Sequence, residues 1–153
     1  MNELFMRVAL EQADIAASMD EIPVGAVIVR ADEIIATAHN RRRIDRDPTA
    51  HAEILALRAA GEALGDWRLD GCELYVTLEP CQMCASAIGM ARIDHVWYGA
   101  PDVKQGCCGS VLSLTDEARL GVSTPSTGGI LAEECAERLS KFMSALRKAK
   151  GNV

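Results

Sequence analysis

Two β-type segments near the N-terminus are followed by helix and strand patterns in alternation, an order that leaves few folds open. Apolar residues recur at helical spacing over residues 2–19, and β-branched runs at 24–29 and 34–38 flank a polar turn. The later patterns are a helix started by Asp47-Pro48-Thr49 and stopped near Gly65, a strand at 72–78, a helix at 81–91, a strand at 93–98 and a helix at 130–150. This order predicts an α/β domain whose mixed sheet is covered by helices on both faces.

Chain length and composition indicate a single domain over residues 1–153, because 153 residues with 49% apolar content can bury a core of their own. Residues 99–129 are rich in Gly, Ser, Thr and Asp, and predict only a short helical turn near Val111. The sequence shows neither a secretory signal pattern nor a run of roughly 18 apolar residues. We therefore expect a soluble, cytoplasmic protein without a membrane span.

The charge is unevenly distributed. A net charge of −6 argues mildly against nucleic acid as a partner, because phosphate binding usually leaves a basic footprint. Against that average, four arginines surround Asp45 within residues 41–46, and residues 138–150 carry five basic side chains and no acid. Each cluster can be a solvated loop or a helix end that complements the helix dipole. Together the two basic clusters are compatible with an anionic substrate.

Three side chains with zinc-ligand chemistry, His51, Cys81 and Cys84, lie where two helices are predicted to begin. A helix N-terminus lowers the pKa of a cysteine, and residues three apart share a helix face, so Cys81 and Cys84 can bind one ion. One imidazole and two thiolates leave the fourth tetrahedral position to water, as in catalytic zinc sites. We therefore predict one Zn²⁺ per chain.

Glu53 is the candidate catalytic residue. Zinc lowers the pKa of bound water from ~16 to about 7 and so supplies hydroxide at neutral pH. Expelling ammonia from an amino-substituted ring also requires a proton carrier, and Glu53 follows His51 by two residues in the first helical turn. Residues two apart on a helix face different ways, so spacing alone does not bring Glu53 to the metal.

The Cys-x-x-Cys motif has other interpretations. Placed after a strand at a helix start, it is also typical of a thioredoxin-type redox pair. The upstream His-x-Glu favours the metal, because H-x-E followed by P-C-x-x-C is the known signature of zinc nucleobase deaminases. A structural zinc lacks an obvious fourth ligand, since His39 and His95 lie in or beside strands. The other cysteines are expected to pack in the interior or in a turn: Cys72, Cys107, Cys108 and Cys135.

Beyond the metal motifs, the chain resembles the bacterial tRNA-specific adenosine deaminases, the TadA type within the cytidine deaminase-like fold. The likeness runs from about Leu4 to Leu146. Its landmarks are EIPVGAV at 21–27, DPTAHAEILALR at 47–58, LYVTLEPCQMCA at 74–85, YGAPDVKQG at 98–106 and GILAEECAERLSKF at 129–142. The resemblance implies a three-layer α/β/α fold with a mixed five-stranded sheet, a homodimer, and hydrolytic deamination of the wobble adenosine of a tRNA anticodon loop to inosine.

The resemblance also implies substrate-binding roles for four residues. Asn40 matches an asparagine that contacts the target base or its sugar, although the sequence alone favours a simple turn residue ending a strand. Asp102 and Lys104 match a loop that lies against the flipped-out nucleotide and its neighbours. Phe142 matches an aromatic residue that stacks in the anticodon loop.

The chain departs from the family at positions that bear on RNA contact. Met143 and Ser144 stand where the family usually has a second aromatic residue and an arginine, and Gly121-Val122 replaces an Asn-His pair. These departures leave a deaminase of a free nucleobase or nucleoside, of guanine or cytosine type, as an alternative. A non-catalytic zinc-binding partner subunit is a further alternative, against which the presence of Glu53 argues.

Overall fold

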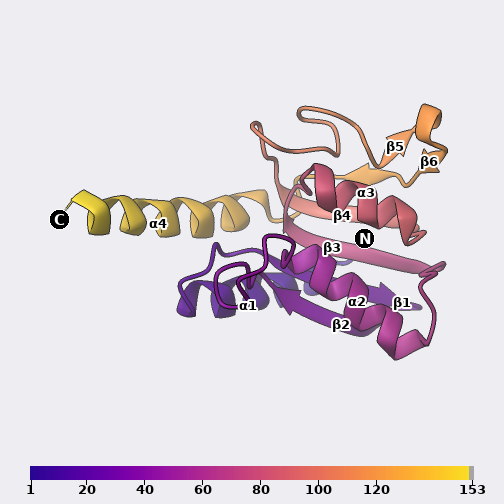
Figure 1. The fold of residues 1–153 in the computed structure, drawn as a ribbon, viewed down its shortest axis with the longest axis horizontal. Helices are drawn as coiled ribbons and strands as arrows, with labels where there is room; N and C mark the ends of the chain where they lie inside the picture. The colour runs from indigo at the N-terminus through magenta and orange to yellow at the C-terminus, as the bar shows by residue number, and fades with distance from the viewer. Residues whose placement is uncertain (152–153) are drawn as a thin grey trace.

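A mixed sheet in the order β2-β1-β3-β4-β7 forms the centre of the computed structural model, which describes residues 1–151 (Figure 1). Over this range the elements are α1 (Glu3–Ser18), β1 (Gly25–Arg30), β2 (Glu33–His39), α2 (Ala52–Leu64), β3 (Cys72–Leu78), α3 (Gln82–Met90), β4 (His95–Ala100), β5 (Asp116–Glu117), η1 (Ala118–Leu120), β6 (Val122–Ser123), β7 (Ser126–Thr127) and α4 (Ala132–Gly151). β1 pairs antiparallel with β2 and β3, whereas β4 pairs parallel with β3 and β7. The predicted α/β class and five-stranded mixed sheet are confirmed.

Alternate residues of the central strands enter two separate cores. Ala26 and Ile28 of β1 pack with α2 and α3 on one face, whereas Val27 and Val29 pack with α1 and α4 on the other. Because both faces are covered, β1 is buried along nearly its whole length and its sequence is almost continuously apolar. This arrangement gives the three layers that the family resemblance implies.

The first helix lies close against the start of the sheet. A Cβ placed on Gly25 would stand 1.9 Å from the Ala9 carbonyl oxygen of α1, so no larger residue fits there without displacing the helix. At the other end of the chain, α4 projects beyond the sheet, and every residue from 143 to 151 is exposed (Figure 1). Of the described helices, none combines the length and the apolar character that crossing a membrane requires.

Element boundaries differ from the sequence-based expectations in three places. The Asp47-Pro48-Thr49 segment forms a turn in which Asp47 accepts hydrogen bonds from Thr49, and α2 begins only at Ala52. The strand expected from residue 93 begins at His95. The helical turn expected near Val111 is wrong: that segment holds an isolated bridge between Cys108 and Ser113, and the short helix lies later, at η1.

The six cysteines, all within the described residues, are free thiols. Cys72 and Cys135 are buried in the two cores, as expected, and Cys107 and Cys108 are also buried. These four therefore pack in the interior. Of the remaining two, at the start of α3, Cys84 is also buried and Cys81 is partly exposed.

Candidate metal centre and substrate cavity

The starts of α2 and α3 bring the three predicted metal ligands together. His51 and Cys81 are the N-cap residues of these helices, with extended backbones, and neither side chain caps its own helix. The Nδ1 atom of His51 lies 3.7 Å from the Sγ of Cys81 and 3.5 Å from the Sγ of Cys84. A tetrahedral zinc with Zn–S of ~2.3 Å and Zn–N of ~2.0 Å separates sulfur and nitrogen by about 3.5 Å. The donor set therefore fits zinc.

This site is the single group of three or more His, Cys, Asp or Glu ligands found within residues 1–151, and its ligand atoms lie within 4.8 Å of one another. Both helices point their N-termini at it, and the partial positive charge of a helix N-terminus stabilises thiolates. The helices themselves are held by the core beneath them, where Ala52 and Ile88 are fully buried against the sheet. Packing thus fixes the relative positions of the ligands.

The two thiols have different acidities. Hydrogen bonds from Cys84 and His51 lower the pKa of Cys81 to about 4, against the opposing effect of burial. The neighbouring Cys81 thiolate and burial raise the pKa of Cys84. The hydrogen bond to Cys81 also raises the pKa of His51. One sulfur is therefore a thiolate at neutral pH, and a bound dication favours loss of the second thiol proton and the neutral form of the imidazole.

Glu53 borders the same cavity as His51 and Cys81, despite the unfavourable spacing. His51 has φ −77° and ψ 153°, so it lies outside the helical spiral and the 100° step per residue does not apply between it and Glu53. The Glu53 side chain is buried, with 4% of the residue exposed, and burial raises its pKa. A carboxyl group with these surroundings can hold a proton close to the metal site.

The cavity above the metal site has a volume of about 670 Å³, within the range of small-molecule sites. Beside Ile22, Val24 and residues 51–53, its wall is formed by four stretches: Asn40 and Arg42 after β2; Leu78, Glu79 and Cys81 around the end of β3; the 101–105 loop; and Leu139, Ser140, Met143 and Arg147 of α4. The predicted residues Asn40, Asp102 and Lys104 are thus brought together with the metal ligands. Phe142 is half-buried and lies outside the set of lining residues, which includes the neighbouring Met143.

Asn40 is both a turn residue and part of the cavity. Its Nδ2 donates to the Ile22 carbonyl at 3.3 Å, and its Oδ1 accepts from the Arg42 backbone N–H at 3.2 Å. These bonds fix the orientation of a side chain that is 7% exposed. Since the amide nitrogen carries two protons, one remains for a ligand.

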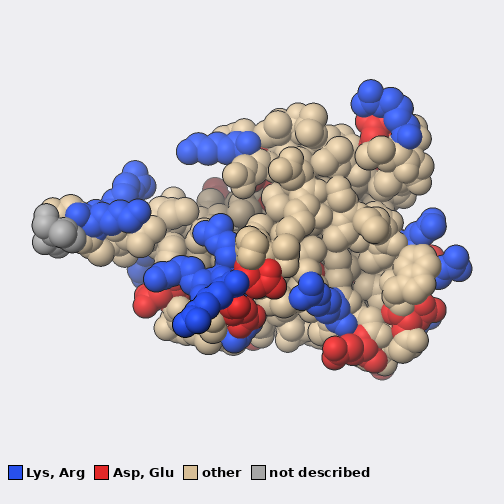
Figure 2. All heavy atoms as spheres, in the orientation of Figure 1, with Lys and Arg blue, Asp and Glu red and all other residues tan. Residues whose placement is uncertain are grey.

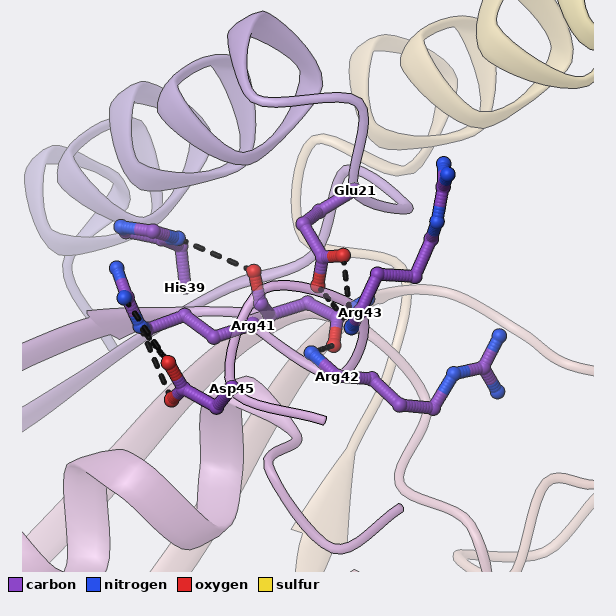
Figure 3. Close-up of polar contacts among 7 residues, drawn as sticks. Glu21, His39, Arg41, Arg42, Arg43 and Asp45 are labelled. Atoms are coloured by element: carbon purple, nitrogen blue, oxygen red, sulfur yellow. Dashed lines mark hydrogen bonds and ion pairs between the residues drawn. The ribbon is translucent and has the colours of Figure 1, made fainter. Parts of the chain in front are cut away.

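The arginine cluster at 41–46 consists of side chains with different surroundings (Figure 3). Arg41 forms a two-pronged ion pair with Asp45, at 3.0 to 3.1 Å, so its charge is compensated within the loop. The carboxylate of Glu21, 1% exposed, accepts the backbone N–H of Arg43 with both oxygens, at 2.9 and 3.2 Å. Figure 3 shows the Arg42 side chain extending away from these contacts, and Arg42 borders the cavity.

The second basic cluster, at 138–150, lies on α4. Arg138 is paired with Asp14 of α1 at 2.9 Å and so ties the helix to the body of the domain. Arg147, further along, borders the cavity. Figure 2 shows basic side chains along the projecting helix and on the neighbouring part of the body, where acidic side chains are interspersed. Part of each basic cluster is therefore structural, and part faces the cavity.

Two buried acidic residues that support the cavity wall are not among the site residues predicted from the sequence. Glu21 and Glu79 are almost completely buried, and each accepts backbone N–H groups from a loop that borders the cavity. Burial raises the pKa of Glu79, but hydrogen bonds from Ser110, Asp102 and Cys108 outweigh that effect and leave the pKa lowered. The position of Glu79, between a buried strand and the Pro-Cys pair, is the one feature that hints at a role near the metal.

Comparison with known proteins supports the assignment of the metal site. Residues 1–100 match the family model of the cytidine and deoxycytidylate deaminase zinc-binding region. The tRNA-specific adenosine deaminase of Bacillus subtilis (strain 168) is 46% identical over 149 residues, which cover 97% of this chain and 92% of that protein.

Two solved structures extend the comparison. One, from work on A-to-I editing by tRNA:A34 deaminases at the wobble position of transfer RNA, matches with a TM-score of 0.87 and 45% identity, over 90% of this chain and all of the other. A guanine deaminase from Bacillus subtilis matches with a TM-score of 0.64 and 40% identity, over 80% of this chain and 72% of the other. The geometry of the ligands, the family model and the nearly full-length relatives agree: the chain belongs to the tRNA-specific adenosine deaminases, within the cytidine and deoxycytidylate deaminase family of zinc proteins.

Proposed function

We propose that this chain is a zinc-dependent hydrolytic deaminase that converts the wobble adenosine of a tRNA anticodon loop to inosine and releases ammonia. The observation that carries the proposal is a single cavity bordered by Glu53, by two of the three grouped metal ligands, His51 and Cys81, and by the cations Arg42, Lys104 and Arg147. Nearly full-length similarity to tRNA-specific adenosine deaminases supports the same substrate. Cations at the mouth of a cavity suit the phosphates on either side of an extruded nucleotide.

The proposed chemistry divides between the metal and the chain. His51, Cys81 and Cys84 would hold the zinc, which when bound would lower the pKa of a water to about 7 and so supply hydroxide as the nucleophile. Glu53 would take one proton from the water and give it to the ring nitrogen, and would then take the second proton, from the hydroxyl left on the ring carbon, and give it to the departing amine. Adenosine and water thus become inosine and ammonia. The burial of Glu53 keeps bulk water from competing for these protons.

The side chains around the cavity have proposed binding roles. Asn40, held by its two backbone hydrogen bonds, offers its remaining amide proton to the base or its sugar. Asp102 and Lys104 lie against the flipped-out nucleotide and its neighbours, and Phe142 stacks in the anticodon loop. A base in such a loop is already partly unstacked, so its extrusion costs only a few kcal/mol.

The proposal is tested by measuring ammonia release from an anticodon stem-loop beside free adenine, guanine, cytosine and their nucleosides. We expect turnover of the stem-loop at its wobble adenosine and none of the free bases. Turnover of guanine or cytosine without action on the stem-loop would instead establish the free-base alternative. Similarity to the guanine deaminase is the reason for including these bases. Zinc-loaded protein that is inactive toward every substrate would support a non-catalytic partner subunit.

We also propose that residues 1–153 form one deaminase domain that acts in the cytoplasm as a homodimer, as the resemblance implies. A surface hollow of about 730 Å³ between α2 and α3 is bordered by the exposed side chains of Trp67 and Met90. Burial of such an apolar surface between two copies favours association. Light scattering coupled to size-exclusion chromatography tests this, and a monomeric mass at micromolar concentration would reject the dimer.

A further inference from the structure

Glu79 is a buried carboxylate whose partners all belong to one loop. It is 2% exposed, and none of the ion pairs within residues 1–151 involves it. Its Oε1 accepts the backbone N–H of Asp102 at 3.1 Å and the hydroxyl of Ser110 at 2.5 Å. Its Oε2 accepts the backbone N–H groups of Cys108 at 3.0 Å and Ser110 at 3.1 Å. A carboxylate has about four acceptor positions, so none remains for a substrate.

The loop from residue 101 to 110 is folded around this carboxylate. It has little regular structure, and its internal bonds include Gly106 N–H to the Asp102 carbonyl at 2.8 Å. A Cβ placed on Gly106 would stand 2.4 Å from the carboxyl carbon of Glu79, so the loop can approach this closely only with glycine at that position. Cys107 N–H also donates to the Pro80 carbonyl, at 2.8 Å, and ties the loop to the start of the metal motif.

The same loop supplies one wall of the cavity. Its residues 101–105 border the space above the metal site, and Val103, Lys104 and Gln105 are exposed there. The metal ligands, by contrast, lie at the starts of helices packed on the sheet, and the loop bonds the backbone of the adjoining Pro80 rather than a ligand side chain. A change at Glu79 therefore acts on the wall without directly altering the ligand set.

From these contacts we propose that Glu79 is a positioning residue: by binding three backbone N–H groups, it holds the 101–110 loop in place as the substrate wall. Through that loop it sets the affinity for substrate, while the chemical step stays with the metal site and Glu53. The assignment of the substrate rests on the proposed function. The hold of Glu79 on the 101–110 loop, which we call the tether, is inferred from the contacts of Glu79 alone.

The test uses Glu79→Gln in the full-length zinc-loaded protein. Glutamine has the same shape but exchanges one acceptor oxygen for an N–H donor, which then faces backbone donors. We expect the amides of Asp102, Cys108 and Ser110 to exchange with deuterium about tenfold faster, and KM for the stem-loop to rise about tenfold with kcat changed less than about threefold. Zinc content should stay at about one per chain.

Two further variants make the result specific. Glu73→Gln alters a carboxylate on the same strand, β3, that accepts Trp97 Nε1–H at 2.8 Å and lies outside the cavity wall. It should leave the loop amides and KM unchanged. Ser110→Ala removes one of the four bonds to Glu79 and should give a smaller change in the same direction. If Glu79→Gln does not fold, Ser110→Ala alone tests whether Glu79 holds the loop.

The outcomes separate this inference from the proposed function. Deuterium exchange and zinc content need no substrate, so they test the tether even if the wild-type protein does not deaminate the stem-loop. Exchange at the three amides that stays at the wild-type rate in both Glu79→Gln and Ser110→Ala would overturn the tether. So would a fall in kcat with KM unchanged, because it would place Glu79 in the chemical step.

Discussion

The metal centre and the wall of the cavity above it are built in different ways. His51, Cys81 and Cys84 lie at the starts of two helices that are packed on the sheet, so the hydrophobic core determines their positions. The wall consists of loops after β2 and β4 and of the exposed half of α4, and a few polar contacts to buried carboxylates hold these loops. We therefore expect that changes in the wall alter substrate binding, whereas changes at the metal centre alter the chemical step.

The largest expected effect is at the proton carrier. Glu53→Gln preserves the shape of the side chain but cannot carry the proton, and general acid–base catalysis typically contributes about 10²–10⁴-fold. We expect kcat to fall by roughly 10³-fold while zinc content and the binding of the stem-loop are unchanged. Steady-state ammonia release and metal analysis measure the two properties. A variant with nearly wild-type kcat would remove Glu53 from the mechanism.

Loss of a ligand should disturb the metal centre itself. Cys84→Ala leaves two protein ligands, so we expect zinc to fall from about one per chain toward zero, with loss of turnover. Because bound metal stabilises the folded state, the temperature of unfolding should fall as well. Cys72→Ala is the matched control, since Cys72 is buried in the core away from the cavity and should keep its zinc. A metal-free, active wild-type protein with a Cys81–Cys84 disulfide would support a redox pair instead.

Changes in the wall should affect binding and leave the metal centre intact. Arg42 borders the cavity and extends away from the contacts that hold its loop (Figure 3), so Arg42→Ala should raise KM for the stem-loop about tenfold. The slope of affinity against salt concentration should fall by about one. Arg119→Ala, which removes a charge outside the cavity wall, serves as the control. An unchanged salt slope in Arg42→Ala would exclude a phosphate contact.

The smallest effect is expected on α4. Phe142→Ala should raise KM for the stem-loop by about fivefold, the lower end of what aromatic stacking on a base contributes. Met143→Ala is the comparison, because Met143 borders the cavity and its neighbour Phe142 does not. Binding of a fluorescent stem-loop measures both variants. A larger loss in Met143→Ala than in Phe142→Ala would move the α4 contact from the predicted aromatic residue to the methionine.

The sequence predicts the metal centre better than it predicts the wall of the cavity. The metal ligands are predictable because cysteines three apart and a histidine at helix starts leave a local pattern, and the strands around them are apolar enough to recognise. The fifth strand, β7, is two residues long, too short for an alternating pattern, and comes from the family resemblance alone.

The wall is predictable only in part. Glu21 and Glu79 bind loops 22 to 31 residues away along the chain, and nothing in the local pattern reports such contacts. The start of α2 differs from the prediction for a similar reason. The Asp47 carboxylate accepts hydrogen bonds from Thr49 in a turn, so the helix begins at Ala52, three residues after Thr49. Glu53 reaches the cavity because His51 is an N-cap with extended backbone, a detail that residue spacing does not show.

The most direct test of the account is to locate the product. Wild-type protein with about one zinc per chain and its Glu53→Gln variant are incubated with an anticodon stem-loop, and the RNA is analysed nucleotide by nucleotide by mass spectrometry. We expect a single inosine, at the wobble position, in the wild-type reaction, and none with Glu53→Gln although that variant retains zinc and binds the RNA. Inosine formed equally by both proteins, or ammonia released only from a free base, would rule out the proposed function.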